Sequence, residues 1–367
     1  MAVSEEDLRG RRSLLRTRLE RRNLAAWTLV PGPNLRYFTG LEIEPSERVI
    51  LFVEAAEGGA FAVVPHFEVE RVRAALGAIP GLRIFPYRDE TGPDPSLARA
   101  FGAMGTRPAA LGAEFGVMRL FERAAVEGAV PRARWHALDA DTAALRQVKD
   151  AVELAAVRRA AAIARAAVEA GLHAAVPGNS EQDVADACRG VLAAHHTHSP
   201  FGILVASGPR SADPHSGAGH RRLQSGDLLW VDVGAVVDGY CGDITRTVAV
   251  GEVDPELLRV LDVVSHAQRL AIAAVRPGVT AASIDAVARS AIAEAGLGAY
   301  FTHRTGHGLG LQEHEPPYIV DGNEEPLQVG MAFTVEPGIY LPGRGGARME
   351  DDVLVTADGA EVLTAEA

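Results

Sequence analysis

The sequence has little cysteine and no long apolar segment. Its two cysteines, Cys188 and Cys241, are too few for a disulfide framework or for a metal site built from thiolates. The Ala-rich stretch at residues 160–175 is interrupted by Arg165 and Glu169, so it cannot be a membrane span. The N-terminus shows no apolar region of the kind found in signal peptides. These absences predict a protein of the cytoplasm with no membrane partner.

Positive charge is scarce as well. Lys and Arg total 36 against 48 Asp and Glu, which gives a net charge of −12 at pH 7. Binding of nucleic acid needs a concentrated basic surface, so nucleic acid is excluded as the main partner. The Arg-rich segment 9–22 is a local exception. Its arginines alternate with leucines, which predicts an amphipathic helix on the surface.

The length and the apolar content indicate a folded enzyme of two domains. The chain has 367 residues, of which 47% are hydrophobic, enough for a sizeable core. Residues 1–145 alternate between helix and strand patterns, which predicts a small α/β domain. The predicted helices there are 9–23 and 67–76, and the predicted strands are 26–30, 49–53 and 60–64. Asp150 and Glu153 resemble the start of a helix, so a second domain is expected at 146–367.

The second domain repeats itself. Pro177-Gly178 and Pro277-Gly278 lie 100 residues apart, and each stands between two predicted helices. Each copy then reaches a glycine that is followed, six residues later, by an acid at the end of an apolar strand. The two pairs are Gly226 with Asp232 and Gly330 with Glu336. A half-domain used twice predicts an α+β fold with a pseudo-two-fold repeat and a site where the halves meet.

Two aspartates on neighbouring strands are the first candidates for chemistry. Asp238-Gly239 lies between two apolar segments and is a strong tight-turn signal. A two-residue turn there places Asp232 opposite Thr245 and Asp243 on the same face, one diagonal step away. Two ionised carboxylates at such a short separation repel each other unless a cation compensates their charge. Either aspartate alone could face solvent at a strand end, but the pair indicates a metal.

The second half of the domain supplies matching groups. Glu336 occupies the position of the repeat that is equivalent to Asp232. Glu350 is one of three consecutive acids, 350–352, and position alone does not choose among them. His307 lies in a Gly-rich loop and would be the one nitrogen ligand of an oxygen-rich site. On its own, a histidine in such a loop could equally be structural.

The donor set predicts the metal and the reaction. Four carboxylates and one imidazole suit divalent ions such as Mn²⁺, which we place first, Co²⁺ or Zn²⁺. Four carboxylates exceed what one ion needs, so we expect two ions about 3.5–4 Å apart that activate a water for hydrolysis. The residues alone point to Asp232, Asp243, Glu336 and one of the acids 350–352, with His307 as the candidate nitrogen ligand.

Four motifs follow one another in the order of a known family. They are Asp-Val-Gly at 232–234 with Gly-Asp-Ile-Thr-Arg at 242–246, the His-containing segment 305–317, Thr-Val-Glu-Pro-Gly at 334–338, and Arg-Met-Glu-Asp-Asp at 348–352. The chain thereby resembles the creatinase/aminopeptidase P/methionine aminopeptidase family of pita-bread metallopeptidases. The resemblance implies that the five metal ligands are Asp232, Asp243, His307, Glu336 and Glu350. The segment 34–40, Asn-Leu-Arg-Tyr-Phe-Thr-Gly, resembles a marker of the creatinase-type N-terminal domain. Methionine aminopeptidases lack that domain, so the resemblance is closer to the Xaa-Pro peptidases.

The resemblance implies roles for residues beside the metals. Glu336 would be both a ligand and the general base. His215 would contact the substrate, and His314 would polarise the scissile carbonyl, because a tetrahedral oxyanion needs fixed donors. The supporting groups would be His303 at the proline pocket, with Arg348 and Tyr340 further out. Arg348 and Tyr340 each have a purely structural alternative. The sole role of Arg348 could be to balance the charge of the acids 350–352, and that of Tyr340 could be packing.

The implied activity is removal of an N-terminal residue before proline by a homodimeric exopeptidase with two metals. Its substrates would be small peptides with proline at the second position, a tertiary amide that needs a dedicated pocket. The compact chain favours an Xaa-Pro dipeptidase, with an aminopeptidase P that accepts longer peptides as the alternative. A dipeptidase must recognise a free carboxylate. Arg48 is a candidate for that clamp, although it could instead form a surface ion pair with Glu47 or Glu44.

Two other functions on the same fold are weighed against this one. Hydrolysis of the creatinase type needs no metal, and non-enzymatic binding proteins of the family typically lose metal ligands. The retention of all five ligand positions argues against both.

Overall fold

The helices and strands fall into two units, one formed by residues up to Leu145 and the other beginning at Arg146. The computed structural model describes residues 3–104 and 110–365. No helix in these ranges is both long and apolar enough to cross a membrane.

The first unit is built on one mixed sheet. Its elements in chain order are α1 (Glu5–Arg21), β1 (Ala26–Leu29), α2 (Pro33–Thr39), β2 (Leu51–Ala55), β3 (Ala60–Pro65), η1 (His66–Glu68), α3 (Val69–Leu76), β4 (Arg83–Tyr87), α4 (Asp94–Gly102), β5 (Ala110–Ala113), α5 (Leu120–Ala129), β6 (Arg134–Ala137) and α6 (Asp139–Arg146). The strand order is β4-β3-β2-β1-β5-β6. The three strands predicted for this unit are confirmed as β1, β2 and β3, with β2 displaced two residues along the chain.

Helix α1 differs from the expected surface helix in one respect. Two of its arginines are buried: Arg11 donates to the carbonyl of Tyr37 over 3.2 Å, and Arg12 donates to that of Phe38 over 2.8 Å. Both carbonyls lie in the last turn of α2, where a helix leaves its C=O groups without partners of its own. The spacing of the arginines in the sequence does not show which of them are buried, because that depends on the carbonyl acceptors that α2 presents.

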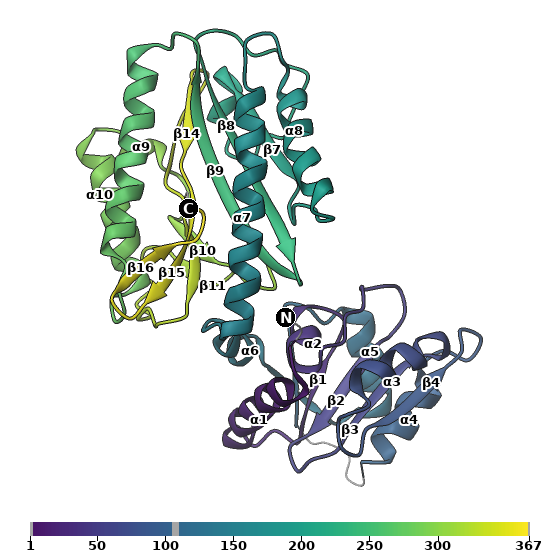
Figure 1. The fold of residues 1–367 in the computed structure, drawn as a ribbon. Helices are drawn as coiled ribbons and strands as arrows, with labels where there is room; N and C mark the ends of the chain where they lie inside the picture. The colour runs from purple at the N-terminus through teal and green to yellow at the C-terminus, as the bar shows by residue number, and fades with distance from the viewer. Residues whose placement is uncertain (1–2, 105–109, 366–367) are drawn as a thin grey trace. The chain divides into compact units, whose positions relative to one another are not determined.

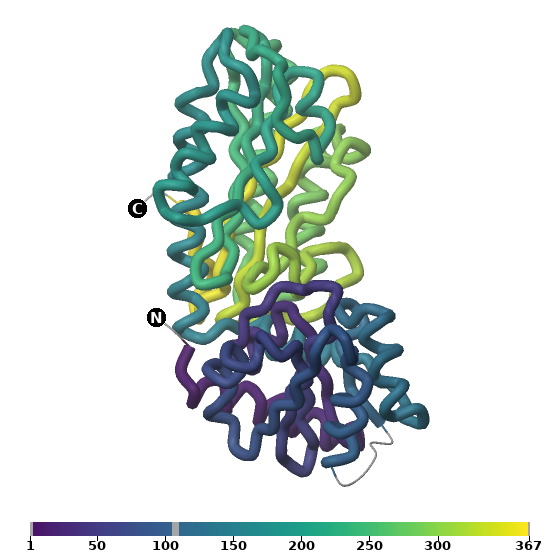
Figure 2. The backbone as a smooth tube through the Cα atoms, turned by 90° about the vertical axis from the view of Figure 1, so that its right-hand side faces the viewer, coloured from purple at the N-terminus to yellow at the C-terminus, as the bar shows by residue number. Residues whose placement is uncertain are grey.

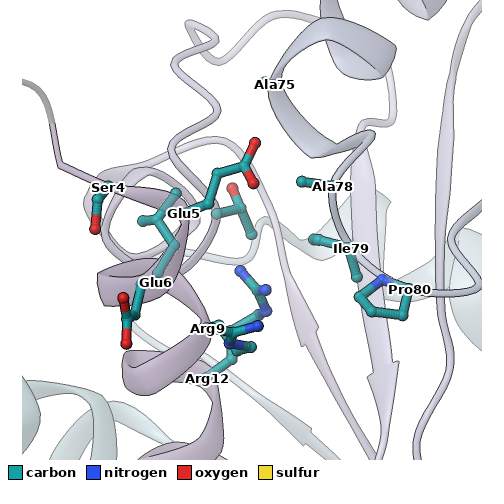
Figure 3. A pocket seen from close by; sticks show the side chains of 11 residues that line it. Ser4, Glu5, Glu6, Arg9, Arg12, Ala75, Ala78, Ile79 and Pro80 are labelled. Atoms are coloured by element: carbon teal, nitrogen blue, oxygen red, sulfur yellow. The ribbon is translucent and has the colours of Figure 1, made fainter.

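A cavity of about 400 Å³ opens in this unit between the first turns of α1 and the chain that follows α3. Figure 3 shows the charged side chains of Glu5, Glu6 and Arg9 on one wall, with Ile79 and Pro80 on the other. Its described lining residues include no histidine or cysteine.

The second unit combines four long helices with three sheets. Its elements are α7 (Ala151–Ala174), α8 (Glu181–Ala194), β7 (Ile203–Ser207), η2 (Gly208–Ala212), β8 (Asp227–Val237), β9 (Tyr240–Val250), α9 (Pro255–Ala274), α10 (Ala281–Glu294), η3 (Gly298–Tyr300), β10 (Gly306–Gly308), β11 (Glu315–Ile319), β12 (Ala332–Val335), β13 (Gly338–Leu341), β14 (Gly345–Arg348), β15 (Asp351–Thr356) and β16 (Gly359–Val362). The sheets are β7-β8-β9, β13-β14 and β11-β10-β12-β15-β16. Helix α7 packs along β8 and β9, and α9 contacts β14. Strand β14 lies beside β8 and β9 (Figure 1), and Figure 2 shows the same unit turned by 90°.

The two halves of this unit reproduce each other's hydrogen bonds, as the repeat predicts. The amide of Gly178 donates to Leu223, and the equivalent Gly278 donates to Leu327. Ser180 forms an isolated bridge with Arg222, and the equivalent Thr280 forms one with Pro326. The acids Asp232 and Glu336 therefore belong to two similar half-domains, but only Glu336 stands at a strand end, because β8 continues past Asp232 to Val237.

The β8–β9 hairpin has the register expected from its turn. Asp238 and Gly239 both have positive φ, 48° and 79°, as a two-residue type I′ turn requires. Asp232 pairs with Thr245, and Asp243 pairs with Gly234, two positions nearer the turn. Because side chains alternate across a strand, Asp232 and Asp243 point to the same face.

Candidate metal centre and active site

A cavity of about 330 Å³ in the second unit gathers most of the predicted site residues. Nine of them line it: His215, Asp232, Asp243, His303, His307, His314, Glu336, Arg348 and Glu350. Tyr340 is buried behind the lining, and Arg48 lies in the other unit.

The five expected metal ligands reach the cavity from both halves of the repeat. Asp232 lies in β8 and Asp243 in β9, whereas His307 lies in β10. Glu336 directly follows β12, and Glu350 stands between β14 and β15. The two halves are joined next to these residues, because the amide of Glu350 donates to the carbonyl of Thr245 over 3.1 Å.

The glycines around His307 are needed for close packing of β10 between its neighbours. A Cβ at Gly306 would lie 1.8 Å from the carbonyl oxygen of Thr334, and one at Gly308 would lie 2.4 Å from that of Pro316. Real Cβ atoms do not approach backbone oxygens so closely. Because the residues on both sides of His307 lack side chains, β10 can pack closely against these backbone oxygens while the ring of His307 lines the cavity.

Ligand atoms of Asp243, His307 and Glu350 all lie within 4.8 Å of one another, and the three residues are buried. Nε2 of His307 lies 3.3 Å from Oε1 of Glu336, which connects a fourth member to this group. Asp232 is anchored through Oδ2, which accepts a 2.6 Å hydrogen bond from Nη2 of Arg348. The distances suit atoms that surround a shared cation.

The protonation of these groups also fits a cation. Among the described residues, nothing donates to the buried oxygens Oδ1 of Asp232 and Oδ1 of Asp243. Burial, reinforced by repulsion from neighbouring acids, raises the pKa of Asp243 and of Glu350 well above that of an ordinary carboxyl. Burial raises the pKa of Glu336 to about 7. A divalent ion would reverse these shifts by compensating the negative charge, so the residues present fit a metal.

The structure bears on two alternatives that the sequence leaves open. One is a purely structural role for His307, and the other is Asp351 or Asp352 in place of Glu350. Burial lowers the pKa of His307 well below its usual value, so the ring is neutral and a nitrogen lone pair is available. Asp351 turns away from the cavity to Arg246, Gln268 and Thr364. Asp352 accepts the amide of Asp243 over 2.9 Å. Glu350 is the one acid of the three that lines the cavity.

Arg348 organises the wall behind Asp232. Besides that carboxylate it donates to the phenol oxygen of Tyr340 over 3.0 Å and to the carbonyl of Pro214 over 3.1 Å. The hydroxyl of Tyr340 in turn lies 3.0 Å from Nε2 of His303. The chain Asp232–Arg348–Tyr340–His303 therefore fixes one side of the cavity through successive hydrogen bonds.

His314 and His215 lie at the more open part of the site. The ring of His314 meets that of His307 edge to face, with centroids 4.1 Å apart. His215 is exposed and follows η2, beside Pro214. Both imidazoles can reach a ligand in the cavity.

Arg48 takes part in a surface ion pair of the first unit. Its Nε and Nη2 donate to the two carboxylate oxygens of Asp89 over 3.0 and 2.8 Å, and Nη1 donates to Glu47. This is the ion-pair alternative considered from the sequence, with Asp89 as an additional partner. A role for Arg48 in carboxylate binding stays a prediction.

Residues that sequence reasoning did not single out also line the cavity. They are Phe201, Leu204, Pro214, Arg304 and Glu313. Arg304 stands directly between His303 and the Thr-Gly-His motif, and its neighbours were the signal that could have drawn attention to it. Phe201 and Leu204 come from β7 and the loop before it, and Pro214 follows η2.

A buried ion cluster supports the segment that carries His314. The carboxylate of Glu315 pairs with Nζ of Lys149 over 2.9 Å and with the guanidinium of Arg146. Arg146 also donates to the side chain of Gln312 over 3.0 Å. Because buried ion pairs contribute little net stability, we interpret this cluster as a device that fixes the position of the segment.

The fold and the donor set define a metal-dependent peptidase. Residues 155–357 match metallopeptidase family M24, and residues 11–148 match the creatinase/prolidase N-terminal domain. The chain belongs to metallopeptidase family M24, and membership implies divalent metal ions. The family resemblance and the fold class inferred from the sequence are thus confirmed.

Named relatives indicate which peptidases within family M24 this chain resembles. A probable dipeptidase PepE of Mycobacterium tuberculosis is 41% identical over 347 residues, which cover 92% of this chain and 89% of that protein. The structure of a prolidase from Thermococcus sibiricus is 31% identical with a TM-score of 0.91, and the match covers 100% and 98% of the two chains. That of an X-Pro aminopeptidase from Thermotoga maritima is 28% identical with a TM-score of 0.80, covering 95% and 98%. The chain is similar to dipeptidases and to an aminopeptidase.

Proposed function

We propose that this chain is an exopeptidase with two divalent metal ions that hydrolyses the bond between an N-terminal residue and proline. Its preferred substrates are Xaa-Pro dipeptides, and Mn²⁺ is the expected metal. Residues 146–367 form the catalytic domain and residues 1–145 a creatinase-like N-terminal domain. The protein is expected to act in the cytoplasm as a homodimer.

One observation carries the proposal. Four carboxylates and a neutral imidazole, drawn from both halves of an internal repeat, line the same cavity as three further histidines. Bound ions would be held by Asp232, Asp243, His307, Glu336 and Glu350, and would polarise the scissile carbonyl and acidify a water. A structural metal site would have no use for the additional imidazoles or for an open cavity.

The chain's own groups have distinct tasks in this scheme. Glu336 reaches the cavity with a side chain that is 15% exposed, against 3% for His307, so it is placed to accept a proton from the attacking water and to pass it to the proline nitrogen. His314 can donate to the oxygen that becomes negative as the carbonyl is attacked. His303, fixed by Tyr340, borders the space for the proline ring. Arg348 keeps Asp232 oriented, and its charge opposes the rise in pKa that burial causes in that carboxyl.

An aminopeptidase P that accepts longer Xaa-Pro-Xaa peptides is the second candidate, since the similarity includes an X-Pro aminopeptidase. The two candidates share the metal centre and differ in how the far end of the substrate is bound.

The test is an assay of the purified protein after treatment with a chelator. Mn²⁺, Co²⁺ and Zn²⁺ are added back separately, and an Xaa-Pro dipeptide is compared with an Xaa-Pro-Xaa tripeptide. We expect metal-dependent hydrolysis of the dipeptide alone. Hydrolysis of both peptides would identify an aminopeptidase P, and hydrolysis of neither with any metal would refute the proposal.

A further inference from the structure

Arg304 differs from the other cations of the active-site cavity in what its guanidinium contacts. It lines the cavity and lies 4.5 Å above the ring of Tyr318. Within the described parts of the chain, its side chain has neither a hydrogen bond nor an ion pair with a protein acceptor. A guanidinium carries five N–H donors, so this side chain faces the cavity with its hydrogen-bonding capacity unused.

Arg348 and His303, two other basic groups at the cavity, are already engaged or uncharged. The guanidinium of Arg348 uses four of its five N–H donors, on Asp232, Tyr340, Thr245 and the carbonyl of Pro214. Burial lowers the pKa of His303 to about 4, which leaves that ring neutral. Arg304 therefore offers an anionic group of a ligand a guanidinium with free N–H donors, in addition to the metal ions that the carboxylates of the wall would hold.

The backbone that carries Arg304 is held firmly on both sides. Asp285 accepts hydrogen bonds from the amide and the hydroxyl of Thr305 over 3.1 and 2.7 Å. Arg289 pairs with Asp285 and donates to the carbonyl of His303 over 2.6 Å. A fixed main chain with an uncommitted cationic side chain is the arrangement of a preorganised anion-binding residue.

We propose that Arg304 binds the free α-carboxylate of the Xaa-Pro substrate and so makes the enzyme select dipeptides. The inference rests on the function proposed above and assigns the group that reads the end of the substrate. A planar guanidinium matches a carboxylate with two parallel N–H···O bonds. In a longer peptide the same position holds a neutral amide, which offers the guanidinium no charge to compensate.

The experiment compares Arg304→Gln and Arg304→Lys with the wild type on Ala-Pro and on Ala-Pro-amide, which lacks only the charge at its end. We expect Arg304→Gln to raise KM for Ala-Pro about 10- to 100-fold, the loss typical of a hydrogen bond between charged groups. KM for the amide should change less than about 2-fold. The KM of Arg304→Lys for Ala-Pro should lie between those of the wild type and Arg304→Gln, because lysine keeps the charge but lacks the planar guanidinium.

Arg276→Gln is the matched control, because Arg276 is exposed on the same unit and its loss changes the net charge equally. Thermal unfolding of each variant shows whether its fold is intact. An equal rise in KM for the acid and the amide would overturn the proposal and leave Arg304 a structural role. Unchanged KM for both substrates would overturn it as well.

Binding of L-proline and of prolinamide to the metal-loaded protein separates this inference from the proposed function. Calorimetric titration should detect L-proline with the wild type and a binding constant about 10- to 100-fold weaker with Arg304→Gln. That result would support the carboxylate contact even in a protein that hydrolyses no Xaa-Pro peptide. Equal binding of L-proline and prolinamide by the wild type would overturn it.

Discussion

The hydroxyl of Thr245 donates a hydrogen bond of 2.6 Å to Oε2 of Glu350 and accepts one of 3.1 Å from Nε of Arg348. One buried side chain thus links an expected metal ligand to the guanidinium that orients another, Asp232. Groups that orient metal ligands typically matter 10- to 100-fold for metal affinity or activity.

Thr245→Val keeps the shape of this side chain and removes both hydrogen bonds. We expect a decrease of about 10- to 100-fold in metal affinity or in kcat, measured by metal titration and by initial rates. Thr245→Ser restores the hydroxyl and should recover most of the loss. Wild-type behaviour of Thr245→Val would show that Glu350 needs no such support.

Asp243→Asn removes one of the crowded buried carboxylates. Metal binding stabilises a folded protein by an amount that grows with the logarithm of its affinity, so added Mn²⁺ should raise the Tm of the wild type and leave that of the variant nearly unchanged. Without metal, the variant should be at least as stable as the wild type, because repulsion from Glu350 and Asp232 is relieved. The exposed Asp321→Asn is the control. An equal Tm increase in both variants would exclude Asp243 as a ligand.

Gly306→Ala tests the close packing that positions His307. Its Cβ would collide with the carbonyl oxygen of Thr334, so we expect a loss of about 1–3 kcal/mol in the free energy of unfolding and a larger loss of activity. Gly190→Ala in α8 meets no atom within 4 Å and should be neutral or stabilising by about 0.5–1 kcal/mol. Urea unfolding measures both. Equal stability of the two variants would contradict the packing argument.

Glu315→Gln should destabilise the protein in a pH-dependent way. Burial alone would raise the pKa of Glu315, but Lys149 and Arg146 outweigh it and hold the pKa below the ordinary 4.5. The ionised carboxylate therefore contributes stability above pH 4.5, and this contribution is lost as the pH falls through the lowered pKa. We expect a loss of about 3–5 kcal/mol at neutral pH, since two buried cations lose their partner.

Urea unfolding of the wild type and of Glu315→Gln at descending pH should show the two converging in acid. The exposed pair of Arg158 and Glu361 provides the control, because Glu361→Gln should cost only about 0–1 kcal/mol. A difference between wild type and Glu315→Gln that grows below pH 4.5 would have the wrong sign for this mechanism.

The parts of the site that the sequence predicts depend on local geometry. Counting outward from Asp238-Gly239 is enough to place Asp232 opposite Thr245, because a two-residue turn fixes the register of both strands. The choice of Glu350 over its acidic neighbours depends instead on how β15 pairs with β12, far away in the chain. Such a pairing leaves no local trace, so the spacing of residues cannot reveal it.

The partners of the arginines are equally hard to predict from the sequence. The sequence offers Arg48 and Arg304 without saying which has a carboxylate nearby. Arg48 pairs with Asp89, 41 residues along the chain, whereas the contact of the Arg304 guanidinium within residues 3–104 and 110–365 is with the ring of Tyr318. Arg11 and Arg12 turn inward because α2 presents free carbonyls to them. Whether a charge is occupied is a property of the tertiary structure.

The cluster around Glu315 has a consequence for chemical labelling. Lys149 is the only lysine of the chain, and its side chain is 1% exposed. Reagents that acylate ε-amino groups therefore have a single target, which is shielded while Lys149 stays paired with Glu315. The rate of acylation at Lys149 reports how often the support beneath His314 opens, and a substrate or metal that tightens the site should slow it.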